Sequence, residues 1–521
     1  MSQNTSQQIL KRRSLLQIAG GLAAGAGTVA LTGGTMALGS GTAAAATGAF
    51  AHPGLLHTQA DLERMAAKVK AAAQPWTAGW ERLAANSVSQ STWKANPQVT
   101  VYRGSGTPEN YAAMFYDIHA AYQNALRWKI TGDTAHGDAA RNILNSWSAT
   151  MKTLSGSADR FIAAGIYGYQ FANAAELMRG YSGFDLARFK KMMLDIFYPM
   201  SSDFLARHNG SFITNYWGSW DLLSVACVLS IGILCDDQAK VDEAVTYYKS
   251  GAGNGSIKHL IPFLHSGGLG QWVEVGRDQG HATLGVGLAG AICEMAWNQG
   301  IDLYGYDDNR LLKGCEYVAK WNLGHDVPFT AWTWDYGAPG VWSGSQTLTA
   351  ASPDGRGAVR PIWEMIYNHY VNRRGLAAPY VSAAATKVRP EGGGGNYGGA
   401  SGGFDQLGYG TLTFTRAKAT VSIASPTAST SGSASAGASA AAAAGSTSTS
   451  TSASASAPAS ASPSVGSAAT GATTGGTGAL AATGASDSVG YAAGAGVLAV
   501  AVGGVLALRG RRSRGGSHRA G

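Results

Sequence analysis

Between Gly268 and His281 the chain concentrates polar chemistry that packing alone does not require. The ionisable and amide side chains of this stretch are Gln271, Glu274, Arg277, Asp278, Gln279 and His281. An imidazole can accept and return a proton near neutral pH, and a guanidinium can neutralise a carboxylate through two parallel hydrogen bonds. Because glycines interrupt the stretch and an apolar run follows it, we predict a cleft wall at the N-terminus of a helix. The alternative is a structural loop held together by salt bridges.

A second cluster, from Asn215 to Asp221, has the composition of a sugar-binding site. Aromatic faces stack on pyranose rings, and the amide of Asn215 can bond to hydroxyl or carboxyl oxygens. The residues that we predict to contact a substrate in and around these two clusters are Tyr216, Trp217, Trp220, Trp272 and Glu274. The alternative is that the aromatic rings pack in the core and that Asn215 caps a helix.

A third polar cluster runs from Ser352 to Glu364 and continues to Tyr370. The pair Arg360-Pro361 has the form of a loop that leads into a helix, and we predict that Arg360 lines the same cleft. For His369, farther along this segment, a packed structural role is the better interpretation.

Helices must position these clusters, because helical spacing of apolar residues dominates the chain from residue 50 to residue 416. The predicted helices are Asp61–Ala73, Glu109–Thr131, Ala135–Met151, Ser157–Gly180, Leu186–Leu205, Asn215–Leu234, Asp237–Lys249, Gly280–Asn298, Asn309–Trp321 and Ala358–Arg373. Short polar turns join them into hairpins, and no fixed sequence period indicates an open solenoid. We therefore predict a single all-α domain, an incomplete (α/α) toroid. Only Gly410–Thr415 is predicted as a short strand.

The N-terminal residues 1–46 have the pattern of a Tat-type signal peptide. A twin arginine, Arg12-Arg13, precedes an apolar run and a small-residue cleavage site at Ala43–Ala46. The alternative is a Sec signal with an incidental arginine pair. Both interpretations predict that the mature protein is exported.

The C-terminal region is predicted to anchor the protein to a Gram-positive cell wall. Residues 417–479, rich in Ala, Ser and Thr, cannot bury enough apolar surface to fold and predict a disordered stalk. The motif Leu480–Gly484, an apolar span at 489–508 and a basic tail at 509–521 follow in the order of a sortase sorting signal of the LAxTG kind. Sortase and peptidoglycan are therefore predicted partners. The alternative is a plain tail anchor.

The basic charge of the chain belongs to these ends. The 39 Lys and Arg and 31 Asp and Glu give a net charge of +8. The ends predicted to be removed hold eight of the basic residues and one acidic residue, which leaves 31 and 30, a net charge of +1. The charge balance therefore gives no indication of nucleic-acid binding, and a membrane is predicted to be contacted only through the sorting segment.

No pattern in the chain predicts a cofactor or a metal centre. The four cysteines, Cys227, Cys235, Cys293 and Cys315, lack the C-x-x-C spacing of zinc and redox motifs. Cys227 and Cys235 are about 12 Å apart if one helix holds both, which is too far for a disulfide. Cys293 and Cys315 could pair across a helix hairpin, but buried free thiols are the favoured interpretation.

Three segments together resemble the alginate lyase superfamily. They are His52–Thr58, the Asn215 cluster and the sequence Glu274-x-x-Arg277-Asp278-Gln279-Gly280-His281. The resemblance covers about residues 50–416, and its pattern is closest to polysaccharide lyase family thirty-eight, which includes glucuronan and alginate lyases. It implies a helical toroid and β-elimination of an acidic polysaccharide that contains uronic acids.

The resemblance also implies roles for individual residues. Asn215 and Arg277 fit the groups that neutralise the substrate carboxylate, and His281 fits the base or a carboxylate partner. Classical alginate lyases place the tyrosine acid about two helical turns after the arginine, where this chain has Leu284. Approximate spacing in the closer family favours Tyr336, with Tyr216 and Tyr304 as alternatives.

Two other functions stay open from the sequence. An (α/α)-barrel glycoside hydrolase needs two carboxylates flanking the scissile bond. Its candidate carboxylates are Glu274, Asp278, Asp335, Asp354 and Glu364. A non-catalytic glycan-binding protein of the cell surface would need only the aromatic residues and their polar neighbours. The identity of the polyuronate and the choice between endo and exo attack do not follow from the sequence.

Overall fold

In the computed structural model, the described residues are 49–105, 109–357, 359–397 and 402–419. The predicted signal peptide, the LAATG motif, the membrane span, the basic tail and the predicted stalk from residue 420 onward lie outside the described residues. The description below concerns the helical domain.

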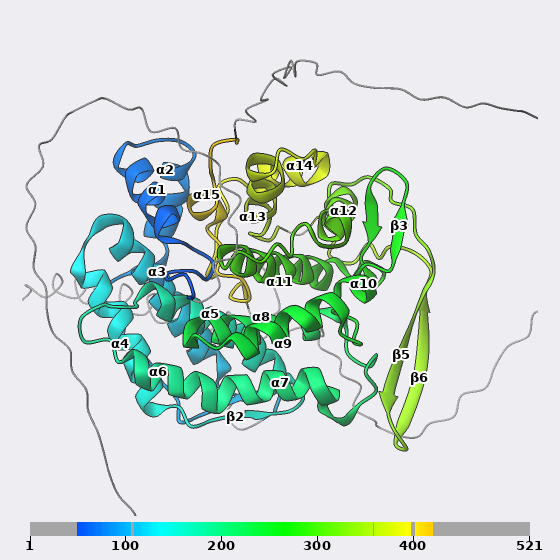
Figure 1. The fold of residues 1–521 in the computed structure, drawn as a ribbon, viewed down its shortest axis with the longest axis horizontal. Helices are drawn as coiled ribbons and strands as arrows, with labels where there is room; N and C mark the ends of the chain where they lie inside the picture. The colour runs from blue at the N-terminus through cyan, green and yellow to red at the C-terminus, as the bar shows by residue number, and fades with distance from the viewer. Residues whose placement is uncertain (1–48, 106–108, 358, 398–401, 420–521) are drawn as a thin grey trace, which may run out of the picture. The chain divides into compact units, whose positions relative to one another are not determined.

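Helices make up most of the regular structure, as the sequence predicted (Figure 1). The α-helices are α1 Gln59–Lys70, α2 Trp76–Ala84, α3 Tyr111–Thr131, α4 Thr134–Thr150, α5 Asp159–Leu177, α6 Leu186–Met192, α7 Tyr198–Arg207, α8 Gly218–Cys235, α9 Gln238–Ser250, α10 Ile257–Leu260, α11 Gln279–Asn298, α12 Tyr306–Asn322, α13 Trp363–Tyr367, α14 Pro379–Val388 and α15 Gly410–Thr413. Short 3-10 helices lie at Ser87–Ser89, His208–Gly210 and Val273–Gly276, and π-helical segments at Met193–Phe197 and Asn368–Arg373.

Local sequence explains where several of these helices begin. Thr58 forms a capping box with Asp61 at the start of α1, and Asp133 and Asp237 accept backbone N–H bonds at the starts of α4 and α9. Such caps satisfy amides that have no partner within the helix. The sequence therefore determined most helix starts to within a few residues.

The helices α3, α5, α8 and α11 form the inner layer of the toroid. Successive members pack against one another, and a returning helix or helix pair separates them along the chain. They therefore run in the same direction, and their N-termini lie at the same end of the domain. The remaining helices flank them, with α4 against α3 and α9 against α8. This arrangement confirms the predicted incomplete (α/α) toroid.

Helix α8 illustrates how deeply the inner layer is buried. Among the described residues it is the one helix long and apolar enough to cross a membrane, yet 94% of its apolar window is buried by protein. It is therefore a core helix. The apolar character of this segment reflects contact with neighbours on every side rather than contact with lipid.

Three two-stranded sheets accompany the helices. Strands β1 Thr100–Arg103 and β2 Thr153–Gly156 are parallel, whereas β3 Phe263–His265 and β4 Leu269–Gln271 are antiparallel. The longest pair is the antiparallel hairpin of β5 Trp332–Ala338 and β6 Trp342–Leu348, which the sequence analysis did not predict. It stands beside the helices at the right of Figure 1.

The predicted strand at Gly410–Thr415 is wrong, because this segment forms helix α15. Its residues are buried without the alternation that a half-buried strand requires. The hydroxyls of Thr413 and Thr415 instead donate to the carbonyls four residues earlier, Tyr409 and Thr411. Threonine in the middle of a helix commonly makes this bond.

All four cysteines are free, which confirms the favoured interpretation. Cys227, Cys293 and Cys315 are buried, and the thiol of Cys293 donates to the hydroxyl of Tyr248 over 3.3 Å. Burial raises the pKa of Cys235 to about 11, which keeps this half-buried thiol protonated.

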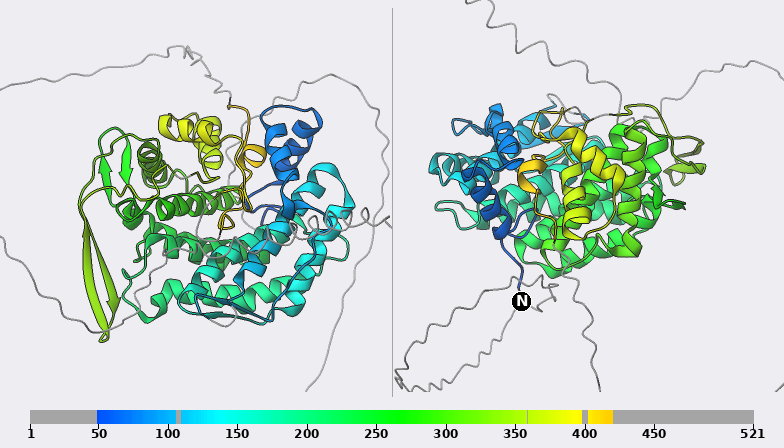
Figure 2. Two further views of the ribbon diagram at one scale, coloured as in Figure 1. Left: turned by 180° about the vertical axis from the view of Figure 1, so that it is seen from behind. Right: turned by 90° about the horizontal axis from the view of Figure 1, so that it is seen from above.

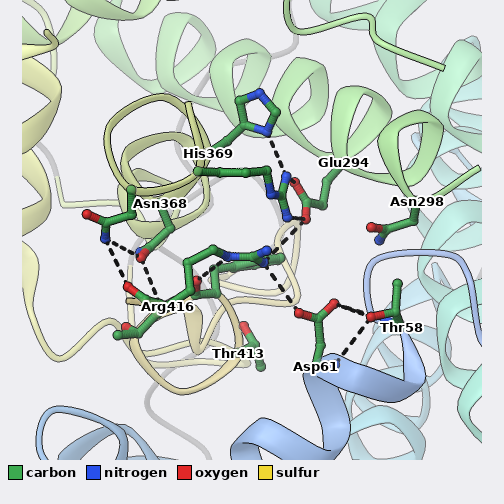
Figure 3. A network of polar contacts seen from close by, with 12 residues as sticks. Thr58, Asp61, Glu294, Asn298, Asn368, His369, Thr413 and Arg416 are labelled. Atoms are coloured by element: carbon green, nitrogen blue, oxygen red, sulfur yellow. Dashed lines mark hydrogen bonds and ion pairs between the residues drawn. The ribbon is translucent and has the colours of Figure 1, made fainter. Parts of the chain in front are cut away.

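The two ends of the domain are joined by a buried polar network (Figure 3). Arg416, near the last described residue, lies 3.4 Å from the carboxylate of Asp61 in α1 and 3.7 Å from that of Glu294 in α11. Arg373 forms a second pair with Glu294 at 2.8 Å, and Arg64 donates to the carbonyl of Thr413. Figure 2 shows the same closure, with α15 between α13 and the first helices α1 and α2.

Charge pairing in this network outweighs the cost of burial. Burial alone raises the pKa of Asp61, but Arg416 and Arg64 lower it well below its usual value. Burial opposes ionisation of Glu294 as well, and Arg373 and Arg416 again lower its pKa. The carboxylates are therefore ionised near neutral pH and depend on the arginines that face them.

We expect Arg416→Met to destabilise the domain through this network. Removing one partner of a buried ion pair costs ~3–5 kcal/mol, and we expect about 2–3 kcal/mol here because Arg64 and Arg373 remain. Urea unfolding measures the change. Arg207→Met is the matched control, since Arg207 is 73% exposed and pairs only at the surface with Asp203. Equal changes in the free energy of unfolding for the two variants would show that the buried network stabilises the domain no more than a surface ion pair does.

Candidate active site

Asp278 begins helix α11 and orients His281. One carboxylate oxygen of Asp278 accepts the backbone N–H of His281 at 2.8 Å, which caps the helix. The other lies 2.7 Å from Nδ1 of the His281 ring. When the carboxylate accepts the Nδ1 proton of a neutral imidazole, Nε2 carries the lone pair. The imidazole is 16% exposed, so Nε2 is positioned to act as a base.

Arg277 lies beside this pair. Its Nε is 3.3 Å from the Asp278 carboxylate, and its guanidinium stacks 5.0 Å from the ring centre of Trp217. Burial lowers the pKa of Arg277, while Glu274 and Asp278 oppose that change. Burial alone raises the pKa of Asp278, but the hydrogen bond and charge of His281, together with Arg277, bring it below its usual value. The guanidinium and the imidazole therefore share one ionised carboxylate.

Glu274 supports the site from inside the protein. It is fully buried, and its carboxylate accepts hydrogen bonds from the hydroxyl of Ser219 at 2.7 Å and from the indole of Trp272 at 3.4 Å. Burial raises its pKa, although His281 and Arg277 oppose this effect. Glu274 lies in the 3-10 turn Val273–Gly276, whereas Asp278 caps α11, so the two do not share one helical face.

Asn215 attaches the β5–β6 hairpin to the helical domain. Its side-chain carbonyl accepts the backbone N–H of Gly337 at 2.7 Å, and its backbone carbonyl accepts the indole N–H of Trp334 at 3.0 Å. The backbone N–H of Phe212 donates to the carbonyl of Gly337 at 2.9 Å. Since Asn215 is buried, it positions the hairpin, and its amide nitrogen is the end that can still donate to an anion.

Through this hairpin, Tyr336 and Trp217 come to the same region as Arg277. Trp217 contacts Trp334 with ring centres 4.5 Å apart, and Trp334 contacts Tyr336 at 4.7 Å. Tyr336 is half-buried and lies on the same hairpin face as Trp334. The structure thus brings Arg277, His281 and Trp217 together, and Tyr336 lies farther out on the hairpin, separated from Trp217 by the ring of Trp334.

Other residues predicted to bind substrate lie in the interior. Trp220 and Trp272 are 2% and 0% exposed, and Glu274 is equally buried, so packing accounts for their positions. Arg360 is 4% exposed and pairs with the buried carboxylate of Asp405 at 2.7 Å, while it also bonds to Thr283. None of these four side chains presents a surface to a polysaccharide in this structure.

The tyrosines considered beside Tyr336 are also internal. Tyr304 is fully buried, and its hydroxyl donates to Glu294 at 3.1 Å. Tyr216 is 4% exposed, and its hydroxyl accepts a hydrogen bond from the side chain of Asn209. Of the three, Tyr336 is the most accessible to a substrate. His369 is packed as predicted, with its ring 3.6 Å from that of Tyr304.

Most of the candidate hydrolase carboxylates are buried or already paired. Glu274 and Glu364 are fully buried, and Asp278 is occupied by His281 and Arg277. Asp335 lies on the opposite hairpin face from Tyr336, and Asp354 is exposed in a loop. Within the part of the chain that the structure describes, no group of three or more His, Cys, Asp and Glu side chains could hold a metal ion.

Carboxylates already lie at the N-termini of two inner helices. Helix α8 begins directly after Trp217, and α11 begins directly after Asp278. Each helix N-terminus carries a partial positive charge of roughly half an elementary charge. Glu274 accepts the backbone N–H of Ser219 in α8 at 3.3 Å, and Asp278 accepts that of His281 in α11 at 2.8 Å. The cation of Arg277, rather than the helix backbone, therefore favours an acidic ligand at this end of the toroid.

Sequence reasoning missed two parts of this site. It treated Asp278 as a candidate carboxylate, although an Asp three residues before a His at a helix start is a recognisable cap and ring partner. It also missed Trp332 and Trp334, which alternate with polar residues in β5 and carry a period-two signal.

Several solved structures are similar to part of this chain at low sequence identity. Alginate lyase A1-III from Sphingomonas species A1 shares 15% identity over 61% of this chain and 88% of its own, with a TM-score of 0.42. A tyrosine-to-phenylalanine variant of alginate lyase A1-III, complexed with a tetrasaccharide, shares 14% identity over 69% of this chain and 95% of its own, with a TM-score of 0.47. An alginate lyase from Bacteroides ovatus shares 12% identity over 52% of this chain and 83% of its own, with a TM-score of 0.38.

No curated protein matches this chain. The family model described as alginate lyase matches residues 65–327, which is just over half of the 521 residues and includes Asn215, Arg277 and His281. The chain therefore belongs to the alginate lyase family and is a carbon–oxygen lyase that acts on polysaccharides.

Proposed function

We propose that this protein cleaves a uronic-acid polysaccharide of the alginate or glucuronan type by β-elimination. The observation that carries the proposal is the Asp278–His281 pair beside Arg277 at the start of α11. It supplies a base with a fixed ring orientation and a cation for a carboxylate within one helical turn. Family membership supports the reaction class, and the cation of Arg277 supports an acidic substrate.

The proposed reaction begins at C5 of the uronic acid. Arg277 neutralises the C6 carboxylate, which makes the C5 proton more acidic, and the amide of Asn215 is the second donor available to that group. His281 takes the C5 proton through Nε2, while Asp278 stabilises the imidazolium that forms. The retained electron pair forms the C4–C5 double bond as the C4–O4 bond breaks. Tyr336 donates a proton to the departing O4.

We expect the purified protein to release unsaturated products from a panel of polyuronates. β-Elimination leaves a C4–C5 double bond conjugated to the carboxyl group, so ultraviolet absorbance rises during turnover. The substrates are alginate, polyglucuronate and, as a control, a neutral glucan. Each reaction is followed by ultraviolet absorbance and by the number of reducing ends, which distinguishes a lyase from a hydrolase and from a glycan-binding protein. Reducing ends without absorbance would indicate a hydrolase, and binding without either signal would indicate a glycan-binding protein.

We expect His281→Ala and Arg277→Ala to remove most turnover while the fold stays intact. Loss of a general base costs roughly 10²- to 10⁴-fold in rate, and an unneutralised carboxylate opposes carbanion formation to a similar degree. The measurement is kcat on the best polyuronate, with circular dichroism of each variant. Near-wild-type activity of His281→Ala would exclude it as the base.

Two controls make this test specific. His325→Ala and Arg207→Ala change exposed residues of the same types away from the site and should leave kcat unchanged. Asp278→Asn keeps a cap for α11 but removes the charge that stabilises the imidazolium. It should lower kcat more than it lowers thermal stability, whereas a purely structural Asp278 would affect both together.

We also propose that the protein is exported and attached to a Gram-positive cell wall. The twin arginine at 12–13 and the order of the LAATG motif, apolar span and basic tail support this localisation. A wall-attached lyase would act on polymers outside the cell, which suits substrates too large for import.

Cell fractionation tests the localisation. A muralytic enzyme should release a protein whose last residue is Thr483, and detergent should not release it. Replacing Leu480 and Thr483 with alanine should move the protein from the wall fraction to the membrane fraction. Detergent release of a wild-type chain that still carries the apolar span would instead establish a tail anchor.

A further inference from the structure

The β5–β6 hairpin has one aromatic face and one polar face. In an antiparallel pair, directly opposed residues project to the same side. The register therefore gathers Trp332, Trp334, Tyr336 and Trp342 on one face, which we call the aromatic face. The other face carries Thr333, Asp335, Ser343, Ser345 and Thr347, all of them exposed.

The rings of the aromatic face continue outward from the candidate active site. Arg277 stacks on Trp217, and Trp217 contacts Trp332 at 5.7 Å and Trp334 at 4.5 Å. Trp334 contacts Tyr336 at 4.7 Å, and Tyr336 contacts Trp342 at 6.0 Å. Consecutive rings thus touch from the carboxylate-binding arginine to the end of the hairpin.

Packing explains the inner rings of this series and leaves the outer ones exposed. Trp332 and Trp334 are half-buried against Trp217. Trp342 is 39% exposed and Val341, in the turn, is 78% exposed. Phe212 and Ile213, in the segment bonded to Gly337, are each 37% exposed. Large apolar side chains gathered on one surface commonly mark a binding site.

The outer part of the hairpin is held in a defined position. Besides the bonds of Asn215 and Phe212 to Gly337, the indole of Trp334 donates to the carbonyls of Thr214 and Asn215. The ring of Tyr336 lies over Gly344 in the neighbouring strand, where a Cβ atom would fall 2.6 Å from its hydroxyl oxygen. A platform fixed in this way loses little conformational entropy when a ligand binds.

We propose that the outer aromatic face, formed by Trp342 with Phe212 alongside, binds sugar units of the polysaccharide beyond the cleaved bond. This inference rests on the proposed function. Flat rings stack on the apolar faces of pyranoses, and the polar opposite face keeps the hairpin soluble. Continuity with Arg277 favours a polymer that enters the site over an unrelated protein partner. The enzyme therefore prefers long chains to short oligosaccharides.

The test compares long and short substrates for Trp342→Ala in the full-length protein. Losing one stacking ring should raise KM for polymeric alginate or polyglucuronate roughly three- to tenfold, with kcat nearly unchanged. On a trisaccharide of the same uronic acid, KM and kcat should stay at wild-type values if the short substrate does not extend to Trp342. Trp342→Phe should restore most of the affinity for the polymer, and Ser343→Ala, on the polar face, should change neither constant.

Direct binding gives a second readout. In the His281→Ala background, which prevents turnover, Trp342→Ala should weaken retention of the protein in polyuronate-containing native gels. Equal changes on polymer and trisaccharide, or no change on either, would overturn the platform while leaving the lyase assignment intact. A wild-type protein that cleaves and binds no polyuronate would overturn both proposals. A concentration-dependent dimer that Trp342→Ala abolishes would assign this face to a second copy instead.

Discussion

The buried ion network of Asp61, Glu294, Arg373 and Arg416 is the constraint on which the arrangement of the domain depends. It joins the first long helix and the last described residues to α11 in the inner layer. The first and last helices of the toroid are far apart in sequence, so side-chain contacts must hold them together. Buried charges are costly unless all of them are paired. The network therefore permits one arrangement of these segments and penalises others.

Helix α11 carries this constraint to the candidate active site. Glu294 lies thirteen residues after His281 on the same helix, a rise of about 20 Å. One part of α11 is thus fixed by the ion network, and its N-terminus presents Asp278 and His281. Because Asp278 caps the helix and holds the ring, the orientation of the base follows from the helix itself. The buried carboxyl group of Glu274 lies behind the site, where it accepts a hydrogen bond from the hydroxyl of Ser219.

The opposite wall comes from a different kind of element. A two-stranded hairpin is only marginally stable alone, and this one depends on Trp217, Trp334 and the bonds of Asn215 to Gly337. The same contacts hold the aromatic face of the hairpin against Trp217, which in turn contacts Arg277. One side of the site is therefore rigid helix, and the other is a hairpin with one aromatic face and one polar face. This combination suits a polymer that must enter from solvent and be held while a proton moves.

The sequence by itself determined most of the long helices, the toroid and the polar segment that holds Arg277 and His281, because helical periodicity, caps and local composition act over a few residues. It did not determine which aromatic residues contact the polar side chains of the site. Trp217 and Trp272 are both buried, at 6% and 0% exposed, yet only Trp217 contacts Arg277. Likewise Arg360 and Arg277 were both predicted to line the site, but Arg360 forms a buried ion pair with Asp405, which is distant in sequence. Burial and ion pairing depend on segments distant in sequence, so only the tertiary structure decided them.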